Sequence, residues 1–432
     1  MADLSSSPAI SKAKRDSGAA SSSKSPFFSR AYGGYTAGQQ QFYLTHLGKL
    51  SGKTILDPMS GQGFLLANLA FEGATVWLGD INPTMCLMSS LRSPEMVQNR
   101  ERLSNWFDEQ LGRGSFSGKS RGAEYVDDWL PDNIRAELRH YRELFGLSGD
   151  PFREREAFSR MPLRKRFAAA IPLLAAREIA CFRSSDNQTW IKPGGLQREP
   201  HITAPLKRAV ASWYAFATAS ADLYREGCQP GQLLTMRMDA AAGDFAMSPK
   251  VNAIVTSPPY ANRLDYTRMW GPESQVAASI WEASVSDIQS RQIGSNVVRG
   301  TDRFRNDEEA LPREIVKALR DIKSDEGYAS EGYYYPFFRN YAVTLASSVK
   351  KLVSRVLRNG TLVFFVRDTV RKDILFPAGL LIEEVLQSEG YRLVGRERQI
   401  VKRHVGLRRR SAGSGLYGVG QQEWWLAFRK VR

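Results

Sequence analysis

Two short loops, each directly after an apolar run, most constrain what this chain can fold into. The first follows the apolar run 54–56 and reads Asp57-Pro58-Met59-Ser60-Gly61-Gln62-Gly63, and the second follows the run 251–256 and reads Ser257-Pro258-Pro259-Tyr260. In the first loop, two glycines let the backbone pass close to a ligand before a helix begins near Phe64. A strand, a tight loop and a helix start form the usual place for a nucleotide-derived ligand.

The second loop is the more specific of the two. Two consecutive prolines fix φ twice and remove two backbone donors, so the chain must leave the sheet stiffly. Such a turn offers hydrogen-bond acceptors, namely the Ser257 hydroxyl and outward-pointing carbonyls, followed by the aromatic face of Tyr260. Acceptors beside an aromatic face suit the exocyclic amino group of a stacked base.

Together the two loops resemble those of the AdoMet-dependent amino-methyltransferases of DNA. The catalytic motif of that family is Ser/Asp/Asn-Pro-Pro-Tyr/Phe, and its cofactor loop is Asp-Pro-x-x-Gly-x-Gly. The resemblance covers residues 27–86, 233–266 and 341–430. It implies an α/β fold with a doubly wound, Rossmann-like sheet of seven strands, and S-adenosyl-L-methionine as cofactor. It also implies four catalytic residues: Ser257, Pro258, Pro259 and Tyr260.

Candidate cofactor residues follow the first two strands. In the first loop they are Asp57, Pro58, Gly61 and Gly63; Asp57 would bind the cofactor's ammonium directly, act through water, or cap the loop. The second strand, predicted at 74–81, ends in Asp80, whose carboxylate would accept hydrogen bonds from ribose hydroxyls.

An acidic residue before strand 251–256 contacts the cofactor's adenine amino group in the resembling family. Asp239 is the first choice here and Asp244 the alternative. An aspartate that only caps a turn is the competing interpretation.

The chain divides into six predicted segments. Residues 1–26 form a polar, Ser-rich tail that we expect to be disordered. Residues 27–90 form the cofactor half of the methyltransferase domain, in which 27–47 either covers the methionine end of AdoMet or only packs. A helical insertion follows at 91–231, the catalytic strand at 232–260, a target-recognition and lid insertion at 261–336, and the C-terminal half at 337–432. In the C-terminal half we predict a helix at 341–357, a turn at 359–360 and a strand at 361–367. The basic residues of the helical insertion either face DNA or are solvated helix faces.

Candidate substrate contacts lie in two places. Asn262, Arg263 and Tyr266 directly follow the catalytic turn. Asn and Arg side chains can form paired hydrogen bonds to a base edge, and an aromatic ring can stack on an extruded nucleotide. Arg403 and Arg408 belong to a basic run at 402–410 that would clamp phosphates. The net charge of +15 likewise favours a polyanion such as DNA as partner.

Other features exclude classes of protein. The chain lacks an apolar stretch of about 18 residues and an apolar block at its N-terminus, so we expect no membrane association and a cytoplasmic location. Its three cysteines are scattered and it has four histidines, so we expect neither a metal site nor disulfides. None of the cysteines stands in the Pro-Cys context of pyrimidine carbon-5 methylation, which helps to exclude that chemistry. We expect all three to be buried small hydrophobes.

The predicted reaction is site-specific methylation of an exocyclic amino group on a flipped DNA base. Within the resembling family, Ser-Pro-Pro-Tyr is similar to the motif of the cytosine-N4 enzymes, so the resemblance favours N4 of cytosine, and N6 of adenine is the alternative. Methylation of RNA or of a protein amide, and a non-catalytic DNA-binding regulator, remain as other functions. The sequence leaves open a cognate restriction nuclease as partner, a restriction-modification or regulatory role, and the oligomeric state.

Overall fold

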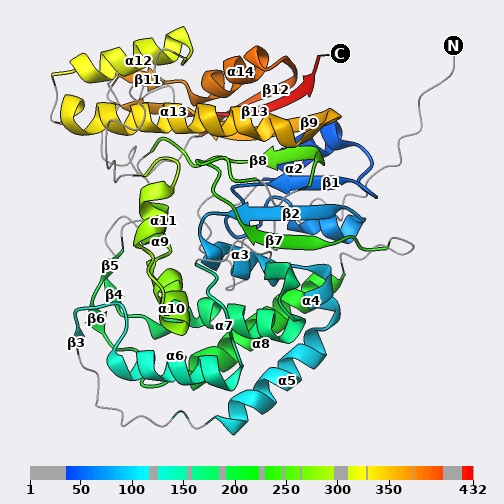
Figure 1. Ribbon diagram of the computed structural model, residues 1–432, viewed down its shortest axis with the longest axis vertical. Coiled ribbons are helices and arrows are strands. Elements are labelled where there is room, and N and C mark those ends of the chain that lie inside the picture. Colours follow the sequence, from blue (N-terminus) through cyan, green and yellow to red (C-terminus); the bar gives the residue numbers. More distant parts are fainter. Residues whose placement is uncertain are drawn as a thin grey trace.

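A single seven-stranded sheet forms the frame of the protein. The computed structural model describes residues 36–114, 116, 125–152, 158–183, 191–222, 229–245, 249–262, 265–295, 310–326, 329–371, 373–401 and 421–431. Its strands lie in the order β12-β13-β9-β8-β1-β2-β7 (Figure 1). Their bounds are β1 (Thr54–Asp57), β2 (Thr75–Asp80), β7 (Leu233–Arg237), β8 (Val251–Thr256), β9 (Val356–Arg367), β12 (Tyr391–Val401) and β13 (Gln421–Lys430).

The strand directions match the predicted fold class. Five neighbouring strands, from β9 to β7, run parallel, and β13 is antiparallel to both β9 and β12. Parallel strands place their carboxyl ends at one edge, where open α/β sheets bind ligands. The predicted doubly wound, seven-stranded α/β fold is therefore confirmed.

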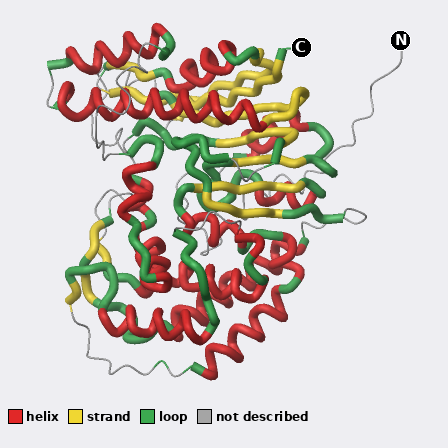
Figure 2. The backbone as a smooth tube through the Cα atoms, viewed as in Figure 1, coloured by secondary structure: helices red, strands yellow, loops and turns green. Residues whose placement is uncertain are grey.

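Helices cover both faces of this sheet (Figure 2). Helix α2 (Ala37–Leu47) and the 3-10 helix η1 (Ala67–Glu72) cover one face, and α13 (Tyr335–Leu352) and α14 (Ala378–Ser388) cover the other. Strand β9 has apolar side chains on both of its faces, and each face needs a helix to cover it. Leu362 and Phe364 pack in the same hydrophobic cluster as α13, while Val363 and Phe365 pack in the same cluster as α2. A strand buried on both sides is a continuous apolar run.

A helical layer packs beyond the β7 edge of the sheet (Figure 1). Its core contains Phe107, Tyr141, Phe167 and Trp213, all fully buried. Within the described part of 91–231, every strand lies outside the main sheet. After α3 (Pro83–Ser90), this segment contains α4 (Pro94–Gln98), α5 (Arg100–Arg113), α6 (Asp132–Leu144), η2 (Phe158–Arg160), α7 (Leu163–Ile179), α8 (Thr203–Ala221) and the short strands β3 (Tyr125–Val126), β4 (Phe182–Arg183), β5 (Lys192–Pro193) and β6 (Gly195–Leu196).

The segment that follows the catalytic turn divides between two layers. Helix α10 (Gly271–Trp281) packs against α6 and α7 in the helical layer, whereas α12 (Arg313–Ser324) packs against α13. The remaining elements are α9 (Tyr266–Met269), α11 (Ser286–Arg291), the π-helix η4 (Ser330–Tyr334), η5 (Val353–Arg355), β10 (Thr369–Arg371) and β11 (Ile374–Phe376). In the described part of the chain, every helix is too short or too polar to cross a membrane.

Three predicted boundaries are wrong. The chain after the glycine loop forms turns and then η1 instead of an α-helix from Phe64, and α13 begins at Tyr335 instead of 341. The predicted turn at 359–360 lies inside β9. Gly360 is needed there for close approach, because a Cβ would lie 2.8 Å from the carbonyl oxygen of Asn252 on β8.

Candidate active site

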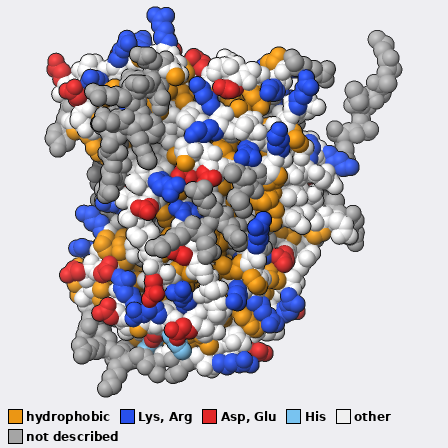
Figure 3. Space-filling model, viewed as in Figure 1, with side chains coloured by type: hydrophobic (Ala, Val, Ile, Leu, Met, Phe, Trp, Pro, Cys, Tyr) orange, Lys and Arg blue, Asp and Glu red, His pale blue; other side chains and the backbone are white. Residues whose placement is uncertain are grey.

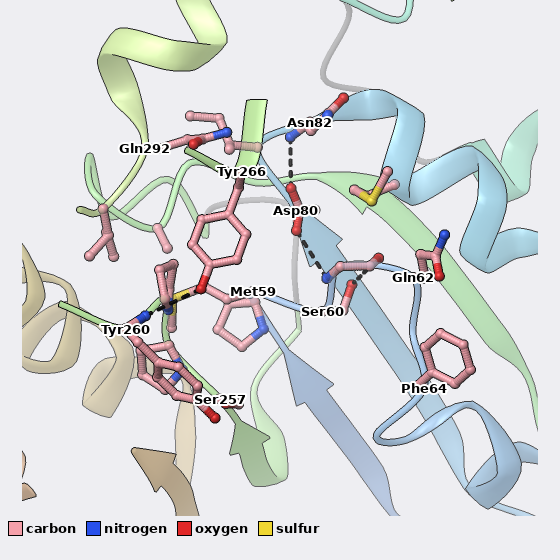
Figure 4. Close-up of a pocket in the computed structure, with 18 of the residues that line it drawn as sticks. Met59, Ser60, Gln62, Phe64, Asp80, Asn82, Ser257, Tyr260, Tyr266 and Gln292 are labelled. Atoms are coloured by element: carbon pink, nitrogen blue, oxygen red, sulfur yellow. Dashed lines mark hydrogen bonds between the residues drawn. The ribbon is translucent and has the colours of Figure 1, made fainter. Parts of the chain in front are cut away.

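A cavity of about 890 Å³ opens at the carboxyl ends of β1, β2, β7 and β8. Residues of both sequence loops line it, including Pro58, Gly61 and Ser257. Figure 4 shows the two loops on opposite sides of Tyr266, whose ring lies between Asp80 and Tyr260. The fold therefore brings together the two loops on which the sequence prediction depends.

Asp80 stands at the end of β2 and lines the cavity. Its Oδ2 accepts the backbone N–H of Gly61 at 3.0 Å, and its Oδ1 accepts that of Asn82 at 2.8 Å. Burial raises the pKa of this carboxyl to about 6. Asn82 in turn caps α3 by accepting the N–H of Thr84 at 3.0 Å. The carboxylate is thus held in one orientation between the cofactor loop and the start of α3.

Asp57 lies behind the cavity wall, and it is 1% exposed. Its Oδ1 accepts a hydrogen bond of 2.7 Å from the Thr256 hydroxyl and one of 3.1 Å from the N–H of Met59. Burial raises the pKa of Asp57 to about 7, against the opposing effect of the Thr256 hydrogen bond. Among the three roles considered for Asp57, these contacts are those of a residue that caps the loop.

The two loop glycines occupy different environments, although both have positive φ, +51° at Gly61 and +75° at Gly63. A Cβ on Gly61 would meet no atom within 4 Å, and Gly61 lines the cavity. A Cβ on Gly63 would lie 2.7 Å from Leu78 Cδ1 and 3.0 Å from Ser89 Cβ. Gly63 therefore lets the loop pack on β2 and α3 and does not itself line the cavity.

All four residues of the proline turn, Ser257 to Tyr260, line the cavity. The Pro259 carbonyl accepts a hydrogen bond of 2.9 Å from the Tyr341 hydroxyl, and the N–H of Tyr260 donates to the Tyr266 hydroxyl at 3.4 Å. Burial raises the pKa of the Tyr260 phenol. Tyr341 was not predicted to be part of the site, because its helical pattern is that of a core residue.

Asp239 lines the cavity beyond β7 and is bound by a residue of α11. Its Oδ2 accepts from Arg291 Nε at 2.8 Å and Nη2 at 2.6 Å, and its Oδ1 accepts the N–H of Ala242 at 3.0 Å. Asp244, the alternative candidate, does not line the cavity and donates its backbone N–H to the Asp239 carbonyl. Helix α11, which follows the proline turn in the chain, is therefore tied directly to the segment beyond β7.

The structure places the predicted substrate residues unevenly. Tyr266 lines the cavity, and Asn262 does not. Arg263, Arg403 and Arg408 lie outside the described residues. Figure 3 shows Lys and Arg side chains spread over the upper and lower parts of one face, mixed with acidic ones.

Sequence reasoning missed a polar cluster that lines the same cavity. This Arg367–Glu423 cluster comprises Gln39 of α2, Arg367 of β9, and Glu423 and Trp425 of β13. Glu423 is 8% exposed and accepts hydrogen bonds from the other three side chains. The available signal was a carboxylate followed by the apolar run 424–428, where only a partnered charge is tolerated.

The described residues contain no group of three or more His, Cys, Asp or Glu side chains that would hold a metal ion. Cys86 and Cys181 are buried free thiols, and burial raises the pKa of each. Cys228 lies outside the described residues.

Comparisons with known proteins give a distant structural likeness. No protein-family model and no curated protein matches the chain. Among solved structures, it is similar to the rRNA methyltransferase aviRa from Streptomyces viridochromogenes, with 11% sequence identity and a TM-score of 0.28 over 92% of this chain and 88% of that chain. A TM-score this low carries no weight for the function of this chain.

Proposed function

We propose that the protein is an AdoMet-dependent methyltransferase that acts on an exocyclic amino group of a DNA base, with N4 of cytosine as the first choice. One observation carries this proposal: the Ser257–Tyr260 turn and the Gly61–Asp80 pair wall the same cavity. The two loops are held together by a hydrogen bond between residues 199 positions apart in the chain.

The cavity wall fits the cofactor at three points. The Asp80 carboxylate offers acceptors for ribose hydroxyls at the end of β2, and Gly61 leaves open space for close approach. Asp239 retains an acceptor position on Oδ1 for the adenine amino group, since a carboxylate oxygen accepts more than one hydrogen bond. A volume of about 890 Å³ lies within the ordinary range of cofactor sites. Bound AdoMet supplies an electrophilic methyl group on sulfur.

The proline turn would orient the amine. The Tyr341 hydroxyl already donates to the Pro259 carbonyl, and we assign the Ser257 hydroxyl and the Pro258 carbonyl as the acceptors of the amine. These oxygens hold the amine in line with the methyl group and stabilise the positive charge that develops on nitrogen. Tyr260 stacks on the flipped base, and the proton leaves once the nitrogen has become acidic.

Other substrates use the same chemistry. N6 of adenine is the first alternative, and an amino group in RNA or a protein amide is the second. The net charge of +15 supports a nucleic acid over a protein substrate. A regulator without catalysis would bind DNA and lack methyl transfer.

Nucleoside mass spectrometry tests the proposal. Purified protein and AdoMet are incubated with unmethylated DNA and, separately, RNA. We expect N4-methylcytosine in DNA, and its loss in Ser257→Ala and Tyr260→Ala. Ser354→Ala is the matched control, because Ser354 is exposed and lies outside the cavity. Methylation of RNA alone, or AdoMet binding without any methylated nucleoside, would overturn the assignment to DNA.

A further inference from the structure

The Arg367–Glu423 cluster presents a charged fork beside the proposed stacking residue. Glu423 Oε1 accepts from Gln39 Nε2 at 2.8 Å and from Trp425 Nε1 at 3.1 Å. Its Oε2 accepts from Arg367 Nη2 at 2.9 Å. Three segments far apart in the chain thus hold one carboxylate, and that carboxylate holds the guanidinium.

Arg367 has donor capacity that its neighbours leave unused. Its guanidinium carbon lies over the Tyr260 ring, 4.8 Å from the ring centre, and the residue lines the cavity. Its Nε is buried and has no hydrogen-bond partner among the described residues. A buried donor without a partner destabilises the folded protein, so an acceptor supplied by a ligand would remove that cost.

We propose that Arg367, positioned by Glu423, recognises the ring edge of the substrate base and selects cytosine over adenine. This inference rests on the proposed function. Beside the carbon that carries the amino group, cytosine has two neighbouring acceptors, N3 and O2. Adenine has N1 followed by a C–H group, and thymine has an N–H donor in that place. A planar guanidinium with parallel donors matches only the first pattern with two hydrogen bonds.

The stacking geometry allows this contact. Arg367 ends β9, which is the neighbour of β8, and Tyr260 follows the end of β8. The guanidinium lies over the Tyr260 ring, so a base that stacks on this face would displace it to the base margin, where Glu423 holds it. Glu423 is accordingly a positioning residue, because its contacts are to other side chains.

The experiment compares Arg367→Met and Arg367→Lys with the wild type. Each methylates matched oligonucleotides that carry cytosine, adenine or 3-deazacytosine at the target position; the deaza base replaces N3 by C–H. We expect kcat/KM on cytosine to fall roughly 10- to 100-fold in both variants, and the preference for cytosine over adenine to shrink. The wild type should methylate 3-deazacytosine with a low kcat/KM, and the variants should methylate it with about the same kcat/KM as the wild type. Arg367→Lys keeps a cation beside Glu423, so it also serves if Arg367→Met unfolds.

Arg371→Lys is the matched control. Arg371 is, like Arg367, a partly buried arginine; it is paired with Asp325 and lies 3.6 Å from the centre of the Tyr334 ring, but it does not line the cavity. We expect Arg371→Lys to keep the base preference. Glu423→Gln should raise KM for the oligonucleotide more than it lowers kcat, with AdoMet affinity unchanged.

Two failures are distinguishable. In the first, the wild type methylates DNA, and Arg367→Lys shows the same base preference and the same loss of activity on 3-deazacytosine as the wild type. This result would overturn the role of Arg367 alone. Absence of methylation by the wild type on every oligonucleotide would overturn the proposed function and this inference together.

Discussion

The Thr256 hydroxyl donates a hydrogen bond of 2.7 Å to Asp57 Oδ1, and this bond joins the last residue of β8 to the last residue of β1. The two strands are parallel neighbours, with Leu56 paired to Ile254. Each of the two sequence loops begins at this pair of strand ends. The bond therefore joins the two strand ends from which the proline turn and the 57–63 loop leave the sheet.

Thr256→Val tests this bond. Valine keeps the shape of threonine but leaves the buried Asp57 without its side-chain partner, so we expect a loss of about 1–3 kcal/mol in the free energy of unfolding. Thr256→Ser keeps the hydroxyl and should lose less. Urea unfolding at pH 8 measures both variants. Equal stability of Thr256→Val and the wild type would show that the bond does not hold the two loops.

Asp57→Asn tests the cost of a buried carboxylate. The folded-state pKa of about 7 lies above the ordinary value of about 4, so between these pH values the folded protein binds more protons than the unfolded chain. Stability should then fall as pH rises through this window, by up to about 4 kcal/mol. Asparagine keeps the acceptor for Thr256 and Met59 and removes the charge. We expect Asp57→Asn to melt well above the wild type at pH 8 and close to it at pH 4; a constant difference would contradict this.

The pH dependence of AdoMet binding tests Asp80. Burial raises the pKa of this carboxyl to about 6, and the ionised form is the better acceptor for ribose hydroxyls. Affinity should therefore fall as pH drops through about 6, and binding should release protons. Calorimetry in buffers with different ionisation enthalpies measures both effects. In Asp80→Asn we expect weaker binding with a flat profile across the same range.

The two loop glycines provide a matched pair of substitutions. Gly63→Ala places a Cβ 2.7 Å from Leu78, so it should lower the melting temperature strongly. Gly61→Ala meets no atom within 4 Å and carries only the cost of a left-handed alanine, about 1 kcal/mol. Its methyl group nevertheless enters the cavity wall, so AdoMet affinity should fall more than stability does. The reverse order of melting temperatures would contradict this assignment.

Arg291→Ala tests the tie between α11 and the cofactor side. Arg291 is 39% exposed, so the ion pair with Asp239 should add little to global stability. Without the ion pair, residues 286–291 should open more often. We therefore expect their amide hydrogens to exchange with solvent faster, while the melting temperature changes little. Hydrogen exchange with mass spectrometry measures this. Unchanged exchange in that segment would show that other contacts hold α11.

Much of the fold was predictable because its signals are local. The apolar runs that became β1, β8 and the end of β9 are bounded by glycine and proline, and a strand buried on both faces has no polar alternation to obscure it. The left-handed glycines, the Asn82 cap and the aspartate at the end of β2 follow from local backbone chemistry. These features sufficed to place two loops at the same edge of one sheet.

Tertiary structure alone decided which other residues share that edge. Gln39, Arg367 and Glu423 come from three separate segments, and no spacing in the chain connects them. Gly360 resembled a turn residue until its approach to β8 was visible, and only the folded structure places Asp57 behind the cavity wall, where it caps the loop. Close packing and desolvation depend on neighbours distant in sequence, so the contacts of these residues emerge only once the chain has folded.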